Sequence, residues 1–444
     1  MKNYVDVEER LPIATTIPLS LQHLFAMVGA TILVPIITGM SPSIALFCSG
    51  IGTLLYIICT KAKLPAYIGS SFAFIGPMLV ASKNYGPEAM ISGVMAAGMV
   101  YIIVAMIIKF CGIGWLNKAL PPVVVGSIVI VIGLGLAGTA INWAGLNSSY
   151  MDASMVSVPR WAWITVAMVT LGVGILGSMY FKGFLAVIPI LVAMITGYVT
   201  ALALGVVPHS AMEAIAATKL FRLPPFMTPK FNLNAMMLMA PVSFVTLAEH
   251  IGHVYVTNNV VGRDFTKEPG LHRSILGDGV ATMFAGFVGG PPNTTYGENI
   301  GVMAITRVYS VWVIGGAGVI AILLSFIGPV AAIIEHMPLP VMGGVSILLF
   351  GIIASSGFRI FVEDKIDFGK KKNLILSSVI IVIGIGGAAV KFKFNGADVE
   401  IAGVALATIV GIILNLILPD ISATEKDTTV EDEFEAKEKA AKAI

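Results

Sequence analysis

Residues 64–78 read LPAYIGSSFAFIGPM, and residues 291–307 read PPNTTYGENIGVMAITR. Both stretches are short and apolar, but proline, glycine and hydroxyl residues stand where an uninterrupted membrane helix would carry leucine and alanine. Proline removes a helical hydrogen bond, and glycine weakens a helix. Backbone groups freed in this way are tolerated at membrane depth only around a cavity. The matched pair therefore predicts two broken segments that form one binding site, with glycines used only for helix packing as the alternative.

The composition is that of a membrane protein. Of the 444 residues, 57% are hydrophobic and 12% are charged, whereas an ordinary soluble domain carries about 25% charged residues. A soluble fold needs a polar surface that this chain cannot supply. The three cysteines give neither a disulfide framework nor metal-binding spacing. The net charge of +2 is too small to indicate nucleic acid as a partner.

The apolar runs predict the number of membrane segments. About 20 apolar residues span a bilayer core, and the polar stretch 208–235 separates seven such runs from seven. PVVVGS at 122–127 and PVMGGV at 340–345 occupy corresponding places in the two halves. Because seven is odd, the second half would be inverted. We therefore predict an all-α polytopic membrane protein of fourteen transmembrane segments in two inverted seven-segment repeats. The runs are 17–38, 42–60, 65–82, 88–110, 121–142, 161–181, 183–207, 236–258, 271–289, 292–307, 308–334, 338–357, 372–393 and 399–418.

Basic residues are distributed unevenly over the predicted loops. With fourteen spans, sixteen lysines and arginines fall on the side of the termini before the C-terminal tail, and seven fall on the other side. The positive-inside rule then places both termini in the cytoplasm. The tail from Asp420 to Ile444 carries eight acidic residues and four lysines, and we expect it to be a solvated extension.

Acidic residues inside the apolar runs are the strongest functional candidates. Glu249 lies in the eighth run and Glu298 in the tenth, and neither run carries lysine or arginine at its centre. An ionisable group at membrane depth is costly and usually faces a pathway or a partner. His253 follows Glu249 by four residues, so the two share one helical face. We expect these residues to contact a ligand or a transported ion.

Other polar residues in the runs have simpler interpretations. His250 points about 100° away from the glutamate on the same helix and is expected to be a hydrogen-bonded packing histidine. Asp278 is expected to pair with Arg273 near the membrane boundary. For Gln22 and His23, packing and function remain equally good explanations.

Two other classes of function fit parts of this pattern. The stretch Glu249-His250-x-x-His253 superficially resembles a zinc protease motif, but the H-E-x-x-H order is absent and no third ligand cluster accompanies it. We therefore predict no metal, no cofactor and no catalytic residue, so that an intramembrane enzyme is the weaker hypothesis. An anion channel or exchanger could share the inverted-repeat design, but the glutamates would repel its ligand.

Two carboxylates and a histidine suit a neutral planar ligand. Ionised carboxylates accept hydrogen bonds, so they would bind ring N–H groups while free backbone amides bind ring carbonyls. Phe72 and Tyr296 lie near glycines and could form an aromatic wall. Histidine and glutamate can exchange protons, which could link binding to proton uptake. The residues alone thus predict a cation-coupled carrier of a small polar ring.

The tenth run also resembles the signature of a known family. Residues 298–307, ENIGVMAITR, match the pattern of the nucleobase–ascorbate transporter family, also called the nucleobase:cation symporters: Gln, Glu or Pro, then Asn, any residue, Gly, four residues and Thr, often followed by Arg or Lys. TIPLSLQHLFAMVGAT at 16–31, PAYIGSSFAF at 65–74 and LAEHIGH at 247–253 are similar to the bacterial uracil permease branch. The resemblance extends to about Leu418 and leaves the acidic tail outside.

The resemblance implies a fold of two domains. Segments one to four and eight to eleven would form a core domain, and the remaining segments would form a gate domain. Segments 3 and 10 would each contain a short extended stretch, and together these would build the substrate site. The implied divisions are 1–16 for a cytoplasmic N-terminus, 17–120 and 236–335 for the core, 121–235 and 336–418 for the gate, and 419–444 for an acidic cytoplasmic tail.

The resemblance further implies proton-coupled uracil import by alternating access at a bacterial inner membrane. Uracil and protons would be the transported partners, lipid would surround the chain, and a homodimer would form through the gate domain. Xanthine and urate carriers of the family usually carry Gln where this chain has Glu298, so Glu298 favours a pyrimidine dione, and a xanthine or purine symporter of the same family is the alternative. By position, Glu249 and Glu298 would bind the ring, the amides of Phe72 and Gly297 would hold its carbonyls, Tyr296 and Ala30 would line the pocket, and His253 with Glu249 would couple protons.

Overall fold

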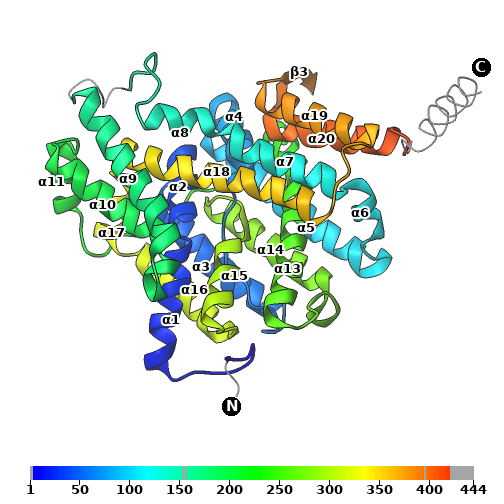
Figure 1. Ribbon diagram of the computed structural model, residues 1–444, viewed down its shortest axis with the longest axis horizontal. Helices are drawn as coiled ribbons and strands as arrows, with labels where there is room; N and C mark the ends of the chain where they lie inside the picture. The colour runs from blue at the N-terminus through cyan, green and yellow to red at the C-terminus, as the bar shows by residue number, and fades with distance from the viewer. Residues whose placement is uncertain (1–3, 153–154, 156–157, 395–396, 421–444) are drawn as a thin grey trace, which may run out of the picture.

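The computed structural model describes residues 4–152, 155, 158–394 and 397–420. This part of the chain is mostly helical and contains four short strands (Figure 1). Its first half comprises α1 (Ile13–Ala26), α2 (Val28–Thr38), α3 (Pro42–Cys59), β1 (Ile68–Ser70), η1 (Phe72–Phe74), α4 (Ile75–Tyr85), α5 (Pro87–Cys111), α6 (Gly114–Ala119), α7 (Pro122–Gly135), α8 (Ala137–Trp143), α9 (Arg160–Tyr180), η3 (Gly183–Val187), α10 (Pro189–Ala203) and α11 (His209–Ala217). Its second half comprises α12 (Leu233–Met239), α13 (Val242–Val261), η4 (Thr266–Gly270), α14 (Leu271–Val288), β2 (Asn293–Thr295), α15 (Gly297–Thr306), α16 (Val311–Ser325), α17 (Gly328–Glu335), α18 (Leu339–Glu363), α19 (Lys371–Ile385), β3 (Ala389–Phe394), β4 (Ala397–Ala402) and α20 (Gly403–Ile417).

Several helices are long and apolar enough to cross a membrane. Length and composition qualify six spans among the described residues, and α1 with α2, bent by 42° at their break, would add a seventh. Three shorter apolar helices, α10, α16 and α20, accompany them. The prediction of a helical polytopic membrane protein is thereby confirmed. Each of the fourteen apolar runs overlaps at least one helix, but fourteen crossings and an inverted repeat remain predictions.

The helices pack in two main groups. In the first, α14 packs on α5 and α3, α16 packs on α3, and α1 packs on α16. In the second, α18 packs on α7 and α9, α10 packs on α9, and α19 packs on α7 and α20. Figure 1 shows α7 and α18 side by side across the molecule, with α19 and α20 towards one end and α9 and α10 towards the other. Both broken segments lie within the first group.

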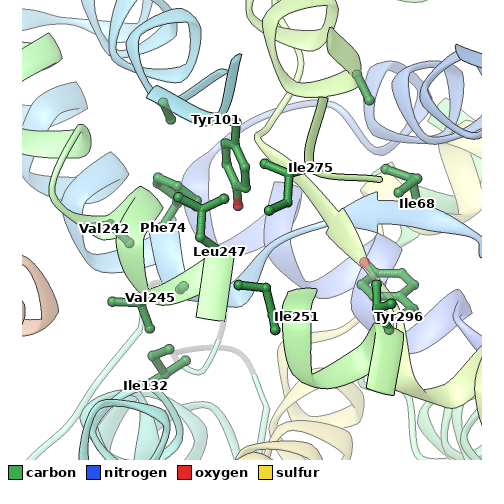
Figure 2. Close-up of a cluster of buried hydrophobic side chains, with 14 of the residues drawn as sticks. Ile68, Phe74, Tyr101, Ile132, Val242, Val245, Leu247, Ile251, Ile275 and Tyr296 are labelled. Atoms are coloured by element: carbon green, nitrogen blue, oxygen red, sulfur yellow. The ribbon is translucent and has the colours of Figure 1, made fainter. Parts of the chain in front are cut away.

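Helix α13, which carries Glu249 and His253, is surrounded by buried apolar side chains. Because such interiors are close-packed, this packing fixes which way the polar side chains of α13 point. Figure 2 shows this packing, with Val242, Val245, Leu247 and Ile251 contributed by α13 itself. The side chains around them are Ile68 of β1, Tyr101 of α5, Ile132 of α7, Ile275 of α14 and Tyr296, the residue just before α15.

A β-hairpin near the C-terminus corrects the expected bounds of the last two apolar runs as helices. The runs 372–393 and 399–418 were expected to be membrane segments, but α19 ends at Ile385 and α20 begins only at Gly403. Between them β3 pairs with β4 as an antiparallel hairpin. Gly387 adopts a positive φ of 75° after α19, and AVKFKF alternates apolar and basic residues with the period of a strand. Alternation of period two outweighed overall hydrophobicity here.

The N-terminal stretch packs against the loop between α15 and α16. The backbone of Val5 donates to Arg307 O at 2.9 Å and accepts from Tyr309 N at 3.0 Å, and Val7 is fully buried. Arg263, just after α13, pairs with Asp6 at 2.7 Å. Residues 5–7 of the expected N-terminal region 1–16 therefore contact the segments that follow α13 and α15, the helices that carry the candidate glutamates, and the region's last residues already belong to α1.

Candidate functional site

The two broken segments meet as a short antiparallel ladder. β1 pairs with β2 in the register Ile68 with Thr295, Gly69 with Thr294 and Ser70 with Asn293. Pro65 precedes β1, and Pro291 and Pro292 precede β2, and proline disfavours continuation of a helix at these points. The all-α fold class therefore includes, as the resemblance implied, extended stretches in both broken segments.

Hydroxyl groups of neighbouring helices satisfy the outer edges of this ladder. On the β1 side, Ser49 of α3 donates to Ile68 O at 2.6 Å, and Thr53 of α3 accepts from Ile68 N at 3.1 Å. On the β2 side, Thr282 of α14 donates to Asn293 O at 3.1 Å and accepts from Asn293 N at 3.2 Å. Unpaired backbone groups away from water are costly, so these hydroxyls allow a two-stranded ladder to exist within a helical bundle.

Each strand leads directly into a helix whose N-terminus has no side-chain cap. η1 and α4 follow Ser71, and α15 follows Tyr296, and neither residue forms a side-chain cap hydrogen bond. The first N–H groups of a helix lack partners within the helix and favour negative charge or carbonyl oxygens. The Ser71 hydroxyl itself is buried and has no hydrogen-bond partner among the residues that the structure describes. The helix starts at Phe72 and Gly297 therefore have no side-chain cap among the described residues, and the binding of a ligand there stays a prediction.

Tyr296 lies flat against β1. A Cβ at Gly69 would stand 2.4 Å from the Tyr296 ring, so only glycine permits this approach. The Tyr296 hydroxyl donates to Ser70 O at 2.7 Å. Phe72 lies on the other side, 6.0 Å between ring centroids from Phe350 of α18. Both aromatic residues expected at the site are thus held at the ladder, and Phe72 reaches the second helix group.

The candidate carboxylates come from α13 and α15. Glu249 is half-buried and Glu298, in the first turn of α15, is exposed. They lie near enough to act on each other electrostatically, and both act on the Tyr296 hydroxyl. α13 contacts η1, β2 and α15. The two glutamates predicted from sequence therefore gather at the crossing of the broken segments, and Ala30 lies on α2, which packs on β1.

His253 is joined to β2 and faces the start of α15. Its Nδ1 lies 3.0 Å from Thr295 Oγ1, and a Cβ at Gly297 would stand 3.2 Å from its Nε2. One ring nitrogen is therefore engaged by the strand and the other is directed towards the helix that bears Glu298. This placement suits the predicted proton-coupling residue.

The expected partner of Asp278 was wrong. Asp278 does not pair with Arg273, which instead donates to Cys59 O at 3.3 Å. Its Oδ2 lies 3.1 Å from His250 Nδ1, and both side chains are fully buried. His250 Nε2 also lies 2.6 Å from Ser274 Oγ. His250 is thus the satisfied buried histidine that was expected, but its partner is the aspartate of α14, which the helix packing brings away from the membrane boundary.

His23 connects α1 to α15. The Asn299 side-chain amide donates to His23 O at 3.0 Å and lies 3.1 Å from His23 Nδ1. Both residues are buried, while Gln22 Oε1 and Asn299 Oδ1 have no hydrogen-bond partner within the described residues. His23 therefore joins α1 to the helix that bears Glu298, and the choice between packing and function for this residue stays open.

Sequence reasoning missed Thr295, Ser274 and Asn299 as partners of the histidines. Thr295 stands two residues after Asn293 in β2. Because side chains of a strand alternate between its two faces, the side chains of Thr295 and Asn293 point to the same side. That alternation was the available signal, but it identifies a face and not its neighbour. Which histidine lies opposite depends on how α13 packs on β2, and no local pattern contains this information.

The cavities near the site are small or apolar. A cavity of about 10 Å³ lies behind the ladder, lined by His253, Thr295 and Tyr296 among others. A separate cavity of about 300 Å³, lined by apolar residues of α1, α2, α10, α16 and α17, includes Met27, Met194 and Ile334. Within the described part of the chain, no three His, Cys, Asp or Glu side chains are placed to hold a metal ion.

Comparisons with known proteins agree with this architecture. A sequence model of the Permease family (Xan_ur_permease) matches residues 14–392. The chain is 52% identical over 424 residues to the uracil permease of Bacillus caldolyticus, covering 94% of this chain and 95% of that protein. It is 51% identical over 416 residues to the uracil permease of Bacillus subtilis (strain 168), with 92% and 94% covered. These relatives are named as transporters, not enzymes.

The fold is also shared with a distant transporter. The transmembrane domain of the cyanobacterial bicarbonate transporter BicA superposes with a TM-score of 0.62, covering 94% of this chain and 100% of that one, at 14% sequence identity. At this identity the likeness concerns the fold alone. Taken with the matched signature around Glu298, the sequence comparisons show that the chain belongs to the nucleobase–ascorbate transporter family of membrane permeases.

Proposed function

We propose that this chain is a proton-coupled uracil symporter of a bacterial inner membrane. The observation that carries the proposal is the convergence of Glu249 and Glu298 at a ladder whose two following helices begin with uncapped N–H groups. The names of the relatives, uracil permeases at about half identity, support uracil as the substrate.

Uracil offers the hydrogen-bonding groups that complement this site. Its two ring N–H groups would donate to the carboxylates of Glu249 and Glu298, because ionised carboxylates only accept. Its two carbonyls would accept from the backbone amides of Phe72 and Gly297. Tyr296 would cover the flat ring, and a site that satisfies each polar group in this way rejects ligands that leave one unpaired. Ala30 would complete the wall.

The same fold serves an anion transporter, so the acidic pair has to explain the difference in ligand. Half-helix N-termini alone attract negative charge. Two glutamates beside them add negative charge that would repel an anion but accept hydrogen bonds from a neutral ring. Fold likeness therefore leaves the ligand open, and the side chains on α13 and α15 favour a neutral N–H donor.

Transport would proceed by movement of the core domain against the gate domain. The packing of α14 on α5 and of α16 on α3 supports the core, and the packing of α18 on α7 and α9 supports the gate. If the chain consists of two inverted seven-segment repeats, the repeat would relate the α14–α5 contact (segments nine and four) to the α16–α3 contact (segments two and eleven). Residues 17–120 with 236–335 and residues 121–235 with 336–418 would move as the two units, with both termini in the cytoplasm and a homodimer formed through the gate.

His253 would couple the substrate to a proton. It lies one helical turn after Glu249 on α13, and one of its ring nitrogens faces Gly297. A histidine between two carboxylates can release or take a proton as the site fills. A proton bound together with uracil would then be carried in the same step.

Uptake into proteoliposomes tests the proposal. Purified protein is reconstituted, and uptake of radiolabelled uracil is measured with and without an imposed gradient that is acidic outside. We expect accumulation that depends on the gradient and is competed by unlabelled uracil far better than by xanthine. Equal uptake with and without the gradient would contradict proton coupling, and strong competition by xanthine would favour a purine carrier.

A further inference from the structure

A continuous set of buried polar groups leads from His253 into the protein. His253 Nδ1 lies 3.0 Å from Thr295 Oγ1, and Thr295 Oγ1 lies 3.4 Å from His250 Nδ1. The same His250 nitrogen lies 3.1 Å from Asp278 Oδ2. On its other side, His250 Nε2 contacts Ser274, whose hydroxyl lies 2.7 Å from Tyr56 OH. Four elements, α3, α13, β2 and α14, thus contribute to one chain of contacts.

The buried Asp278 carboxylate constrains where His250 carries its hydrogen. Asp278 and His250 are both fully buried, and an unpaired buried charge is far costlier than a paired one. The nearby carboxylate therefore favours a hydrogen on His250 Nδ1. That hydrogen is directed at Thr295 Oγ1, because neither Asp278 oxygen has a hydrogen-bond partner among the described residues. Like the aspartate behind a catalytic histidine, the carboxylate selects the ring tautomer of its partner.

The threonine hydroxyl passes this orientation on. A hydroxyl has one proton, so an oxygen that accepts from His250 Nδ1 donates its own proton to His253 Nδ1. His253 would then carry its hydrogen on Nε2, the nitrogen that faces Gly297. If the Thr295 hydroxyl instead accepted a hydrogen from His253 Nδ1 and donated its own to His250 Nδ1, both histidines would be in the opposite tautomer. The state of the buried pair is in this way linked to the proton presented at the substrate site.

We propose that Thr295 is a positioning residue for proton coupling, whose hydroxyl links His253 to the buried His250–Asp278 pair and selects the His253 nitrogen that carries the exchangeable proton. The proposal rests on the proposed symport function. It assigns to Thr295 and Asp278 a role in coupling that does not require either to touch the substrate.

The other titratable groups around this chain are few. Tyr56 of α3 lies edge-on to His250, with 6.1 Å between ring centroids, and Cys59 lies on the same helix. Tyr101 of α5 is near Asp278. Glu249 stands four residues before His253 on α13, and Glu298 follows Gly297, which faces His253 Nε2. Phenols and thiols are neutral near pH 7, so these two glutamates are the further neighbouring groups that can carry a charge.

Adjacent threonines provide a matched test. Thr295→Val keeps the β-branched shape and removes the hydroxyl, whereas Thr295→Ser keeps the hydroxyl. Thr294→Val is the control, because the Thr294 hydroxyl is buried but has no hydrogen-bond partner within the described residues. Each reconstituted variant is assayed for gradient-driven uracil uptake, for uracil exchange without a gradient across pH 5 to 8, and for thermal stability.

Comparing gradient-driven uptake with exchange separates a defect in proton coupling from a general structural defect. For Thr295→Val we expect the ratio of gradient-driven uptake to exchange to fall about tenfold, the factor associated with one hydrogen bond, and the pH profile of exchange to change. Thr295→Ser and Thr294→Val should retain the wild-type ratio. Equal losses of both activities in Thr295→Val, or an unchanged ratio, would overturn the role of Thr295. A wild-type protein without any response to the gradient would instead refute the symport function.

Discussion

The two broken segments share a backbone design and differ in chemistry. Each has a strand of three residues, an uncapped helix start and an edge bound by hydroxyls of a neighbouring helix. Yet residues 64–82 contain no acidic, basic or histidine side chain, whereas residues 291–306 contain Glu298, Asn299 and Thr295. The site therefore takes its shape from both halves of the chain and its charged chemistry from the second half alone, through α13 and α15.

The two broken segments also differ in how they contact neighbouring helices. The first segment contacts the second helix group through Phe72 and Phe350. The second is joined to α1 through His23 and Asn299 and to α13 through Thr295 and His253. The second segment is therefore the one fixed by side-chain hydrogen bonds, and the first provides backbone donors and apolar contact.

The largest expected effect comes from the carboxylates. Glu298→Gln and Glu249→Gln each replace a charged carboxylate, which only accepts hydrogen bonds, by a neutral amide with one accepting oxygen opposite a ring N–H, and we expect uracil binding to weaken by about 100-fold, because a hydrogen bond to a charged group contributes up to ~3 kcal/mol. Isothermal titration calorimetry on purified protein measures this. Glu363→Gln, in an exposed pair with Arg359, is the control, and wild-type affinity in either site variant would refute the assigned roles.

A smaller loss is expected from a methyl group on the first segment. Gly69→Ala places a Cβ 2.4 Å from the Tyr296 ring, which has to move, at a cost of about 1–3 kcal/mol in stability. We expect uracil affinity to fall by about tenfold as well. Gly76→Ala, in the same segment, meets nothing within 4 Å and should leave affinity unchanged and stability unchanged or higher. Equal behaviour of the two variants would show that the Tyr296 position is unimportant.

The hydroxyl anchors allow the two halves to be compared directly. Ser49→Ala removes the donor to Ile68 O, and Thr282→Val removes the group that bonds Asn293. Thr282→Val leaves the Asn293 backbone without its side-chain partner, and Ser49→Ala leaves Ile68 O with only the longer hydrogen bond from Thr53 at 3.4 Å, so we expect each to lower stability by about 1–3 kcal/mol. Thermal unfolding in detergent measures the effect. A loss confined to one variant would show that the two edges are not equivalent, contrary to the shared backbone design.

The smallest effect is expected at the entrance to the first segment. Lys63, just before it, pairs with Glu268 in the loop before α14, and both side chains are exposed. The hydrogen bond from Lys63 lowers the pKa of Glu268, so the pair stabilises the fold at neutral pH and this contribution is lost as the pH falls through the lowered pKa. Glu268→Gln should change the unfolding temperature only slightly at pH 7 and should abolish that small acid-dependent loss. A large destabilisation at pH 7 would contradict this assignment.

The sequence predicts the local features of this fold better than its long-range contacts. Prolines and glycines identified both broken segments, and the isolated glutamates at 249 and 298 pointed to the candidate site beside them, because each breaks a rule of the membrane interior. The partner of Asp278 was wrong, since nearness in sequence favoured Arg273 while packing of α14 on α13 provided His250. The β3–β4 hairpin was missed because its composition is apolar enough for a membrane segment.

The most direct measurement is an experimental structure of the protein with uracil bound. The account predicts a planar ring beside the β1–β2 ladder, with its N–H groups within hydrogen-bond distance of Glu249 and Glu298 and its carbonyls facing the amides of Phe72 and Gly297. A ring bound in the apolar cavity between α2 and α10, or one that contacts neither carboxylate, would contradict it.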